Sequence, residues 1–172
     1  MEVIEAIKKR KSVRKFKKEE VPKKLLLKLV EAAKYAPSGK NLQPYKFKII
    51  TKPKEKQLLK QNPIFLQEFV NSAPAIILCC YMPDEYVKAG YGGSFEYNKN
   101  RCLTSLAIAS QNIILRATEL GLGTCYVGDM NTGMVNELFM PPACYVAYAI
   151  CVGYSDDGSS QRQKKEVNEL LL

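Results

Sequence analysis

The sequence predicts an α+β fold, a mixed sheet with helices on its faces. Helical and strand-like patterns alternate along the chain, so helices and strands have to share a core. Residues 103–120 carry a wide apolar stripe with helical spacing, and residues 74–81 are apolar throughout, which is typical of a central strand buried on both faces. Because the chain has 172 residues, of which 47% are hydrophobic, we expect a single domain over residues 1–172.

Two helices and one strand are expected in the first 50 residues. A short helix over 2–9 is followed by an irregular basic connector over 12–21. Pro22 then stands at the first turn of a helix, where proline is tolerated, and apolar residues follow it at helical spacing. Tyrosine, phenylalanine and isoleucine alternate with lysines over 45–50, which predicts a strand with one buried face.

The rest of the chain continues the alternation. Gly121 ends the long helix, because glycine adopts the backbone conformation that follows a helix. Residues 84–100 have no regular pattern, and their Gly90-Tyr91-Gly92-Gly93 run suggests mobility. In chain order we expect short helices over 53–60 and 63–71, a strand over 74–81, the helix over 103–120, a strand up to 128, a helix over 131–139, a strand over 144–152, a polar turn over 154–160 and a last helix.

The charge balance favours anionic partners. Lys and Arg number 26 against 17 Asp and Glu, which gives a net charge of +9 and suits phosphorylated cofactors, nucleic acid or acidic membranes. The basic residues are spread over helix faces and form no dense block, so we expect no nucleic-acid partner. No apolar run is long enough to span a bilayer, and the start of the chain lacks a signal-peptide pattern. We therefore expect a cytoplasmic protein with no membrane partner.

The cysteines do not suggest a metal site or a disulfide framework. The chain has six cysteines, no C-x-x-C pair and no histidine, so histidine-dependent zinc fingers and histidine-based triads are excluded. All but Cys102 fall in strand-like apolar runs, where a free cysteine behaves as a small hydrophobic residue. We interpret them as core thiols in a reducing compartment, and we expect no metal.

The stretch over residues 36–44 is the first candidate for a binding site. It joins the helix that begins at Pro22 to the strand that begins at Tyr45, and prolines at 37 and 44 bracket it. Between them stand a hydroxyl, a glycine and two amides, which offer donors and acceptors on a rigid frame. Proline, serine, glycine and asparagine are also what ordinary turns contain, so a plain helix-to-strand connection is the alternative interpretation.

Two basic segments at opposite ends of the chain are the second candidate. Arg10, Ser12 and Arg14 are two residues apart, so their side chains share one side if the segment is extended. A guanidinium and a hydroxyl placed in this way can hold a phosphate. Arg162 and Lys164 repeat the spacing near the C-terminus. The two pairs either converge on one phosphate or are separate surface charges.

Taken together, Arg-x-Ser-x-Arg over 10–14 and Ala-Pro-Ser-Gly-Lys-Asn-x-Gln-Pro over 36–44 resemble the nitroreductase family of FMN-dependent oxidoreductases. The resemblance extends over nearly the whole chain, as far as Arg162-x-Lys164. It implies a nitroreductase-like fold with a mainly antiparallel sheet flanked by helices, in an intertwined homodimer with FMN sites at the interface. Two features depart from the family: the basic types at 162 and 164 are swapped, and no extra helical insertion is evident. Residues 84–100 would then have to cover the flavin.

The resemblance also implies which residues hold the cofactor. The N-terminal segment and the C-terminal pair would grip the phosphate, ribityl chain and ring edge, the loop over 36–44 would reach the flavin from the other subunit, and backbone groups around residue 127 would lie beside the ring. The implied positions are Arg10, Lys11, Ser12, Arg14, Arg162 and Lys164 in the first set, Pro37, Ser38, Gly39, Asn41 and Gln43 in the second, and Tyr126, Val127 and Gly128 in the third.

The activity implied by the resemblance is ping-pong hydride transfer. NADH or NADPH would reduce FMN at N5, and a nitroaromatic, quinone or similar small acceptor would then take its place. The flavin carries this chemistry, so we expect no catalytic side chain, with Arg14 as an electrostatic stabiliser. The alternatives are a specialised relative that fragments flavin or removes halogen, a non-catalytic FMN-binding protein, and a nucleic-acid-binding domain.

Overall fold

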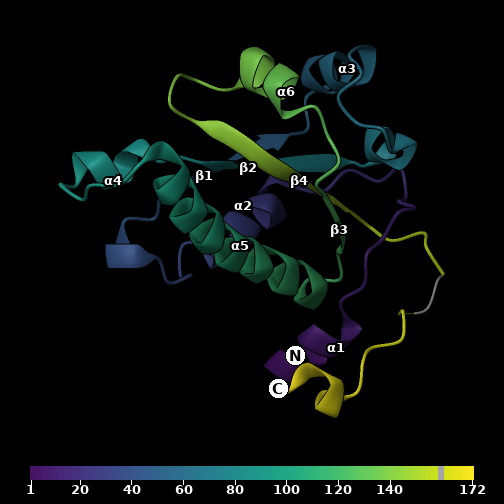
Figure 1. Cartoon of the computed structure of the whole chain (residues 1–172). Coiled ribbons are helices and arrows are strands. Elements are labelled where there is room, and N and C mark those ends of the chain that lie inside the picture. The colour runs from purple at the N-terminus through teal and green to yellow at the C-terminus, as the bar shows by residue number, and fades with distance from the viewer. Residues whose placement is uncertain (159–160) are drawn as a thin grey trace.

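The fold is a four-stranded antiparallel sheet between two layers of helices (Figure 1). The computed structural model describes residues 1–158 and 161–172. The strands stand in the order β1-β2-β4-β3, and all three neighbouring pairs are antiparallel. Their bounds are Tyr45–Ile50 for β1, Ala75–Tyr81 for β2, Gly123–Val127 for β3 and Tyr145–Gly153 for β4.

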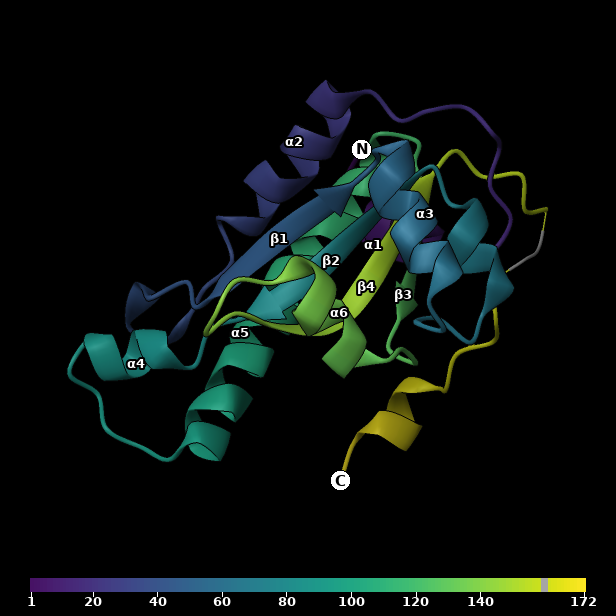
Figure 2. The same cartoon turned by 90° about the horizontal axis from the view of Figure 1, so that it is seen from above.

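Helices cover both faces of this sheet (Figures 1 and 2). On one face lie α2 (Lys23–Ala33) and α5 (Phe95–Glu119), and on the other lie α3 (Pro53–Gln61) and α6 (Thr132–Phe139). Each face has its own core of aliphatic side chains and cysteines. Six of the seven residues of β2 are buried, as expected for a central strand with both faces covered. The predicted α+β class with helices on both faces is confirmed.

The short helix α1 (Val3–Lys9) agrees with the prediction over 2–9, whereas the other short elements depart most from the sequence predictions. They are α4 (Asp84–Lys88) and three 3₁₀ turns, Gly39–Asn41, Glu68–Ser72 and Val167–Leu170. The helix predicted over 63–71 is wrong: Phe65 instead forms a β-bridge with Met130, and only a 3₁₀ turn follows. The last predicted helix is likewise only a 3₁₀ turn of four residues.

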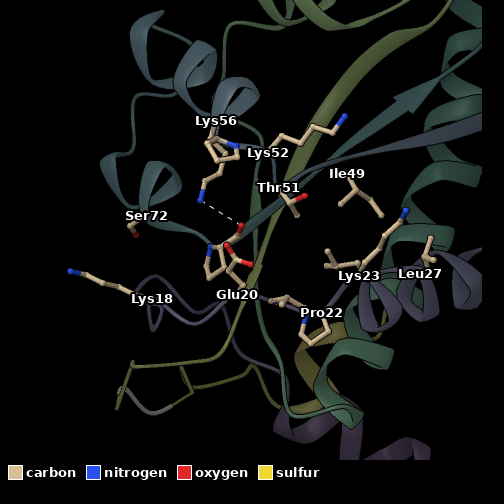
Figure 3. A pocket seen from close by; sticks show the side chains of 14 residues that line it. Lys18, Glu20, Pro22, Lys23, Leu27, Ile49, Thr51, Lys52, Lys56 and Ser72 are labelled. Atoms are coloured by element: carbon tan, nitrogen blue, oxygen red, sulfur yellow. Dashed lines mark hydrogen bonds between the residues drawn. The ribbon is translucent and has the colours of Figure 1, made fainter.

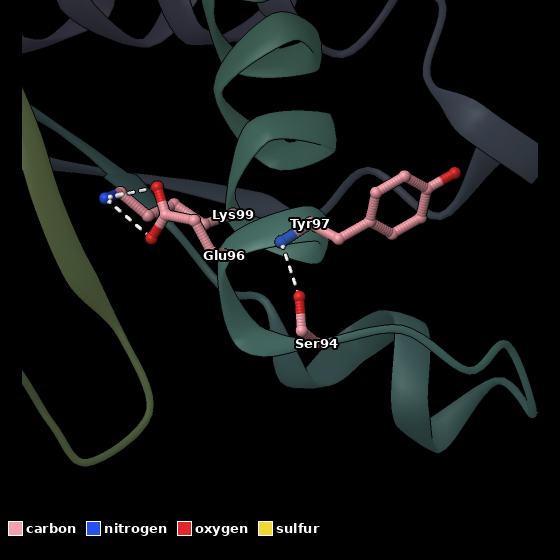
Figure 4. A network of polar contacts seen from close by, with 4 residues as sticks. All are labelled: Ser94, Glu96, Tyr97 and Lys99. Atoms are coloured by element: carbon pink, nitrogen blue, oxygen red, sulfur yellow. Dashed lines mark hydrogen bonds and ion pairs between the residues drawn. The ribbon is translucent and has the colours of Figure 1, made fainter.

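The long helix α5 begins eight residues before the predicted start at 103, at Phe95. Its first two turns carry no apolar stripe, so hydrophobic periodicity does not detect them. They are stabilised by polar contacts (Figure 4). Ser94 caps the helix, with its Oγ accepting from the Tyr97 backbone N–H at 3.2 Å, and Glu96 pairs with Lys99 one turn on.

Two further expectations concern the core and the membrane. All six cysteines are free and buried, which confirms their interpretation as core thiols. Within residues 1–158 and 161–172, no helix combines the length and the apolar character needed to cross a bilayer.

Candidate functional site

The basic connector that follows α1 is fixed against the edge strand β3. The Val13 backbone N–H donates to the Thr124 carbonyl at 2.9 Å, and Ser12 pairs with Thr124 as a parallel β-bridge. The connector lies so close to β3 that a Cβ on Gly123 would stand 2.8 Å from Val13 Cγ2. A side chain at residue 123 would push the connector away, so this close approach depends on the glycine.

The extended segment lines a cavity of about 420 Å³. Arg10, Ser12 and Arg14 all face it, as the two-residue spacing predicts for extended backbone. The C-terminal pair, Arg162 and Lys164, faces the same cavity, so the structure brings both basic segments together. The complete lining is Arg10, Lys11, Ser12, Arg14, Asp157, Gln161, Arg162 and Lys164.

Two polar residues join the two ends of the chain at this cavity. Gln161 Nε2 donates to the Arg10 carbonyl at 2.6 Å and also to the Lys8 carbonyl. The Arg14 backbone N–H donates to Asp157 Oδ2 at 3.3 Å, and Lys11 Nζ donates to the Asp157 carbonyl at 2.8 Å. Sequence reasoning missed Asp157 and Gln161. The only available signal was their place in and beside the polar stretch 154–160.

The cavity has a strong positive bias. Two lysines and three arginines line it, against the single carboxylate of Asp157. The residues of this cavity also act on Cys125 in β3. Burial raises the pKa of the Cys125 thiol, and Arg14, Ser12 and Arg10 oppose that shift. Cations gathered in a partly enclosed cavity favour an anionic ligand, and arginine suits a phosphate because it can donate two parallel hydrogen bonds.

The predicted ring-side residues lie at the end of β3, beyond this lining. Val127 is buried and Gly128 is exposed. Tyr126 is partly exposed and packs edge-on against Tyr148, with 5.4 Å between ring centroids. Burial raises the pKa of Tyr126 to about 12, so its hydroxyl is protonated at neutral pH.

The loop over 36–44 lies elsewhere on the chain. Both views place it beside α4, on the side of the molecule opposite the basic connector (Figures 1 and 2). Ser38 Oγ accepts from the Gln43 backbone N–H at 2.9 Å, and Gln43 Nε2 donates to the Lys34 carbonyl at 3.1 Å. Pro37, Gly39 and Asn41 are exposed. Within one chain, the loop and the cationic cavity therefore form separate sites.

The loop has an uncommon backbone. Lys40, Asn41 and Gln43 all have positive φ values, 56°, 56° and 47°, a region that residues other than glycine seldom adopt. Such conformations persist only where the surrounding structure imposes them, and they concentrate at binding sites. Gly39 lies against the buried ring of Tyr86, where an added Cβ would stand 2.9 Å from the hydroxyl.

Comparison with known proteins gives one consistent family. The profile described as the nitroreductase family matches residues 7–74 and 61–154. A Methanothermobacter thermautotrophicus protein, whose name pairs NADH dehydrogenase with NAD(P)H nitroreductase, is 32% identical over 181 residues, with 100% of this chain and 87% of the relative covered. The chain belongs to the nitroreductase family.

Solved structures show the same fold. A nitroreductase family protein from Clostridium novyi is 31% identical, with a TM-score of 0.77 and coverage of 91% of this chain and 87% of that one. A protein from Exiguobacterium sibiricum, solved in complex with FMN, is only 19% identical but has a TM-score of 0.87, with 99% and 96% covered. The nitroreductase-like fold that the resemblance implied is confirmed.

In this nitroreductase-family chain, residues 84–100 contain more helix than the sequence pattern predicts. They include α4 and the first turns of α5, with Gly90 and Gly93 at positive φ between them. The Arg101 guanidinium stacks over the Tyr86 ring at 3.7 Å, beside Gly39. The segment is therefore attached to the loop over 36–44 and extends the same surface.

Proposed function

We propose that this protein is an FMN-dependent NAD(P)H oxidoreductase that reduces nitroaromatics, quinones or similar small acceptors. The observation that carries the proposal is the convergence of Arg10, Ser12 and Arg14 with Arg162 and Lys164 on one cavity. Family membership supports an oxidoreductase, as does the relative named for NADH dehydrogenase and NAD(P)H nitroreductase.

The residues present fit the phosphate end of FMN. Arg10 and Arg162 would donate paired hydrogen bonds to its oxygens, Ser12 would add a hydroxyl, and Lys11 and Lys164 would add charge. When bound, FMN supplies a ring that accepts hydride from NADH or NADPH and passes the electrons to the acceptor. Arg14 would stabilise negative charge on the reduced ring, with no side-chain acid or base required.

The loop would complete the site from a second copy of the chain. None of the five loop residues lines the cationic cavity of its own chain, and the loop stands on the opposite side of the molecule (Figures 1 and 2), which supports a homodimer with the cofactor between subunits. These residues are Pro37, Ser38, Gly39, Asn41 and Gln43. In this arrangement the backbone of Tyr126, Val127 and Gly128 would lie along the ring.

Exposed apolar surface supports the same assembly. Val3, Ile4 and Ile7 share one face of α1, and 70%, 56% and 48% of their surfaces are exposed. The C-terminal turn adds Val167, Leu170 and Leu171, which are also exposed. Light scattering coupled to gel filtration should give twice the 19.4 kDa of one chain, whereas a single-chain mass would rule out a loop supplied by a partner.

The decisive experiment is a visible absorption spectrum of the purified protein, followed by NADH or NADPH under anaerobic conditions. Flavin bands that bleach on addition, and return with repeated turnover when a quinone or nitroaromatic is supplied, are the expected result. Bound FMN with no NAD(P)H oxidation would instead favour a non-catalytic flavin-binding protein. A colourless protein that does not take up FMN would exclude the proposed cofactor, and salt-dependent nucleic-acid binding would then be tested.

A further inference from the structure

A second, larger cavity lies apart from the proposed cofactor site (Figure 3). It measures about 970 Å³ and is bounded by the end of the basic connector, the start of α2, the end of β1 and the start of α3. None of its lining residues lines the cationic cavity around Arg10. Its volume is at the upper end of the range of small-molecule sites.

The floor of this cavity is apolar. Val21 and Leu26 are buried beneath it, and Ile49 and Pro74 contribute further carbon surface. Leu27 stands at the edge with half of its surface exposed. A floor of this kind favours the hydrocarbon part of a ligand, because covering it removes apolar surface from water.

The rim has a strong positive bias. Lys18, Lys23, Lys52 and Lys56 surround the cavity, and Glu20 is the only carboxylate in the lining. Figure 3 shows Glu20 between Lys18 on one side and Lys23 on the other. Four ammonium groups against one carboxylate leave an excess of positive charge above an apolar floor.

Lys56 is the one cation of the rim that the structure holds in place. Its Nζ donates to the Ala73 carbonyl at 2.7 Å and reaches the Pro74 carbonyl at 3.5 Å. Burial lowers the pKa of Lys56, while Glu20 counteracts part of this shift. An ammonium has three N–H donors, so two carbonyls leave one that can serve a ligand.

We propose that this cavity binds a small amphipathic anion, a carboxylate with an aliphatic body. The hydrocarbon part would cover Leu27, Ile49 and Pro74, whose surfaces are not fully buried, and the carboxylate would lie between Lys23 and Lys52. The lysine stems add apolar wall on the way to their charged ends, so both parts of such a ligand are matched. An inorganic anion would leave the apolar floor uncovered, and an uncharged hydrocarbon would leave the ammonium groups unmatched.

The test is a titration of the isotope-labelled protein, as purified with any cofactor it holds, with octanoate followed by backbone amide NMR. Saturable shifts of the amide signals are expected at Val21, Leu27 and Thr51. The signals of Ser12, which lines the cationic cavity, and of its neighbour Thr124 should not move. Octylammonium has the same chain length and the opposite charge, and it should bind at least ten times more weakly. Equal binding of the two probes would overturn the proposal.

A pair of variants separates this site from general attraction to a basic surface. Lys23→Gln/Lys52→Gln removes two rim charges and should raise the octanoate Kd about tenfold, in line with the loss of two solvent-exposed ion pairs. Lys24→Gln/Lys60→Gln removes one exposed lysine from each of the helices α2 and α3 outside the lining, and it should leave the Kd unchanged. Equal effects of the two double variants, or shifts scattered over all lysines, would show non-specific binding and refute the site.

The apolar part of the site is tested by Leu27→Asn. This substitution is at an exposed position and should weaken the binding of octanoate without altering the charge of the protein.

Discussion

The basic segment over 10–14 and the loop over 36–44 are the two halves of the proposed cofactor site, and the chain builds them differently. In the basic segment, backbone N–H groups donate to Thr124 and Asp157, and the arginine and serine side chains face the cavity. The loop does the reverse: the side chains of Ser38 and Gln43 bond within the protein, and its backbone takes the unusual conformation. The first half therefore depends on charge, and the second on shape.

The largest effect is expected from a substitution that fills the space between β3 and the basic segment. In Gly123→Ala the new methyl group meets Val13 Cγ2 at 2.8 Å and Val13 Cβ at 3.0 Å, so the connector has to move. Overpacking of this kind costs about 1–3 kcal/mol of the free energy of unfolding, which urea denaturation measures. FMN affinity should fall as well, because Ser12 and Arg14 move with Val13.

A second substitution distinguishes this mechanism from a general loss of stability. Val13→Ala removes the methyl groups that clash, so Gly123→Ala/Val13→Ala should be more stable than the sum of the two single variants predicts. If the changes in the free energy of unfolding are strictly additive, the close approach of the connector to β3 does not control the site.

Removing one charge should act on binding without affecting the fold. Arg10→Ala is expected to weaken FMN binding by about 1–3 kcal/mol, the range for a hydrogen bond to a charged group, while the urea midpoint stays nearly constant. Fluorescence titration of FMN into the apoprotein gives the Kd. The matched control is Lys9→Ala, an exposed cation one residue away that does not line the cavity. Equal losses in both variants would remove the assignment of Arg10 to the phosphate.

The loop half should respond to shape. Gly39→Ala places a methyl group 2.9 Å from the Tyr86 hydroxyl, and Tyr86 cannot easily yield because it is 1% exposed and stacked under Arg101. We expect a loss of about 1 kcal/mol in the free energy of unfolding, at the low end of overpacking, together with weaker FMN binding. Tyr86→Phe removes the hydroxyl, so the double variant should recover most of both losses. No recovery would mean that another contact shapes the loop.

The sequence is informative about these halves to different degrees. Arg10, Ser12 and Arg14 could be placed on one cavity because a two-residue spacing has a direct meaning in extended backbone. The contacts of Asp157 and Gln161 join positions more than 140 residues apart, and local patterns carry no information about such contacts. The start of α5 was missed for another reason, since a serine cap and an ion pair stabilise it where the apolar stripe is absent.

The smallest effect expected is also the one that compares the two halves directly. If the basic segment acts through charge, FMN affinity should fall several-fold when salt is raised from low to high concentration, because mobile ions screen exposed charges. The dependence of log Kd on salt should become shallower in Arg10→Ala, which has lost one of the five cations around the cavity. In Gly39→Ala the affinity is lower at every salt concentration, but the slope should match that of the unmodified protein, because no charge has changed. A slope that changes in Gly39→Ala and stays constant in Arg10→Ala would reverse the assignment, with shape at the cationic cavity and charge at the loop.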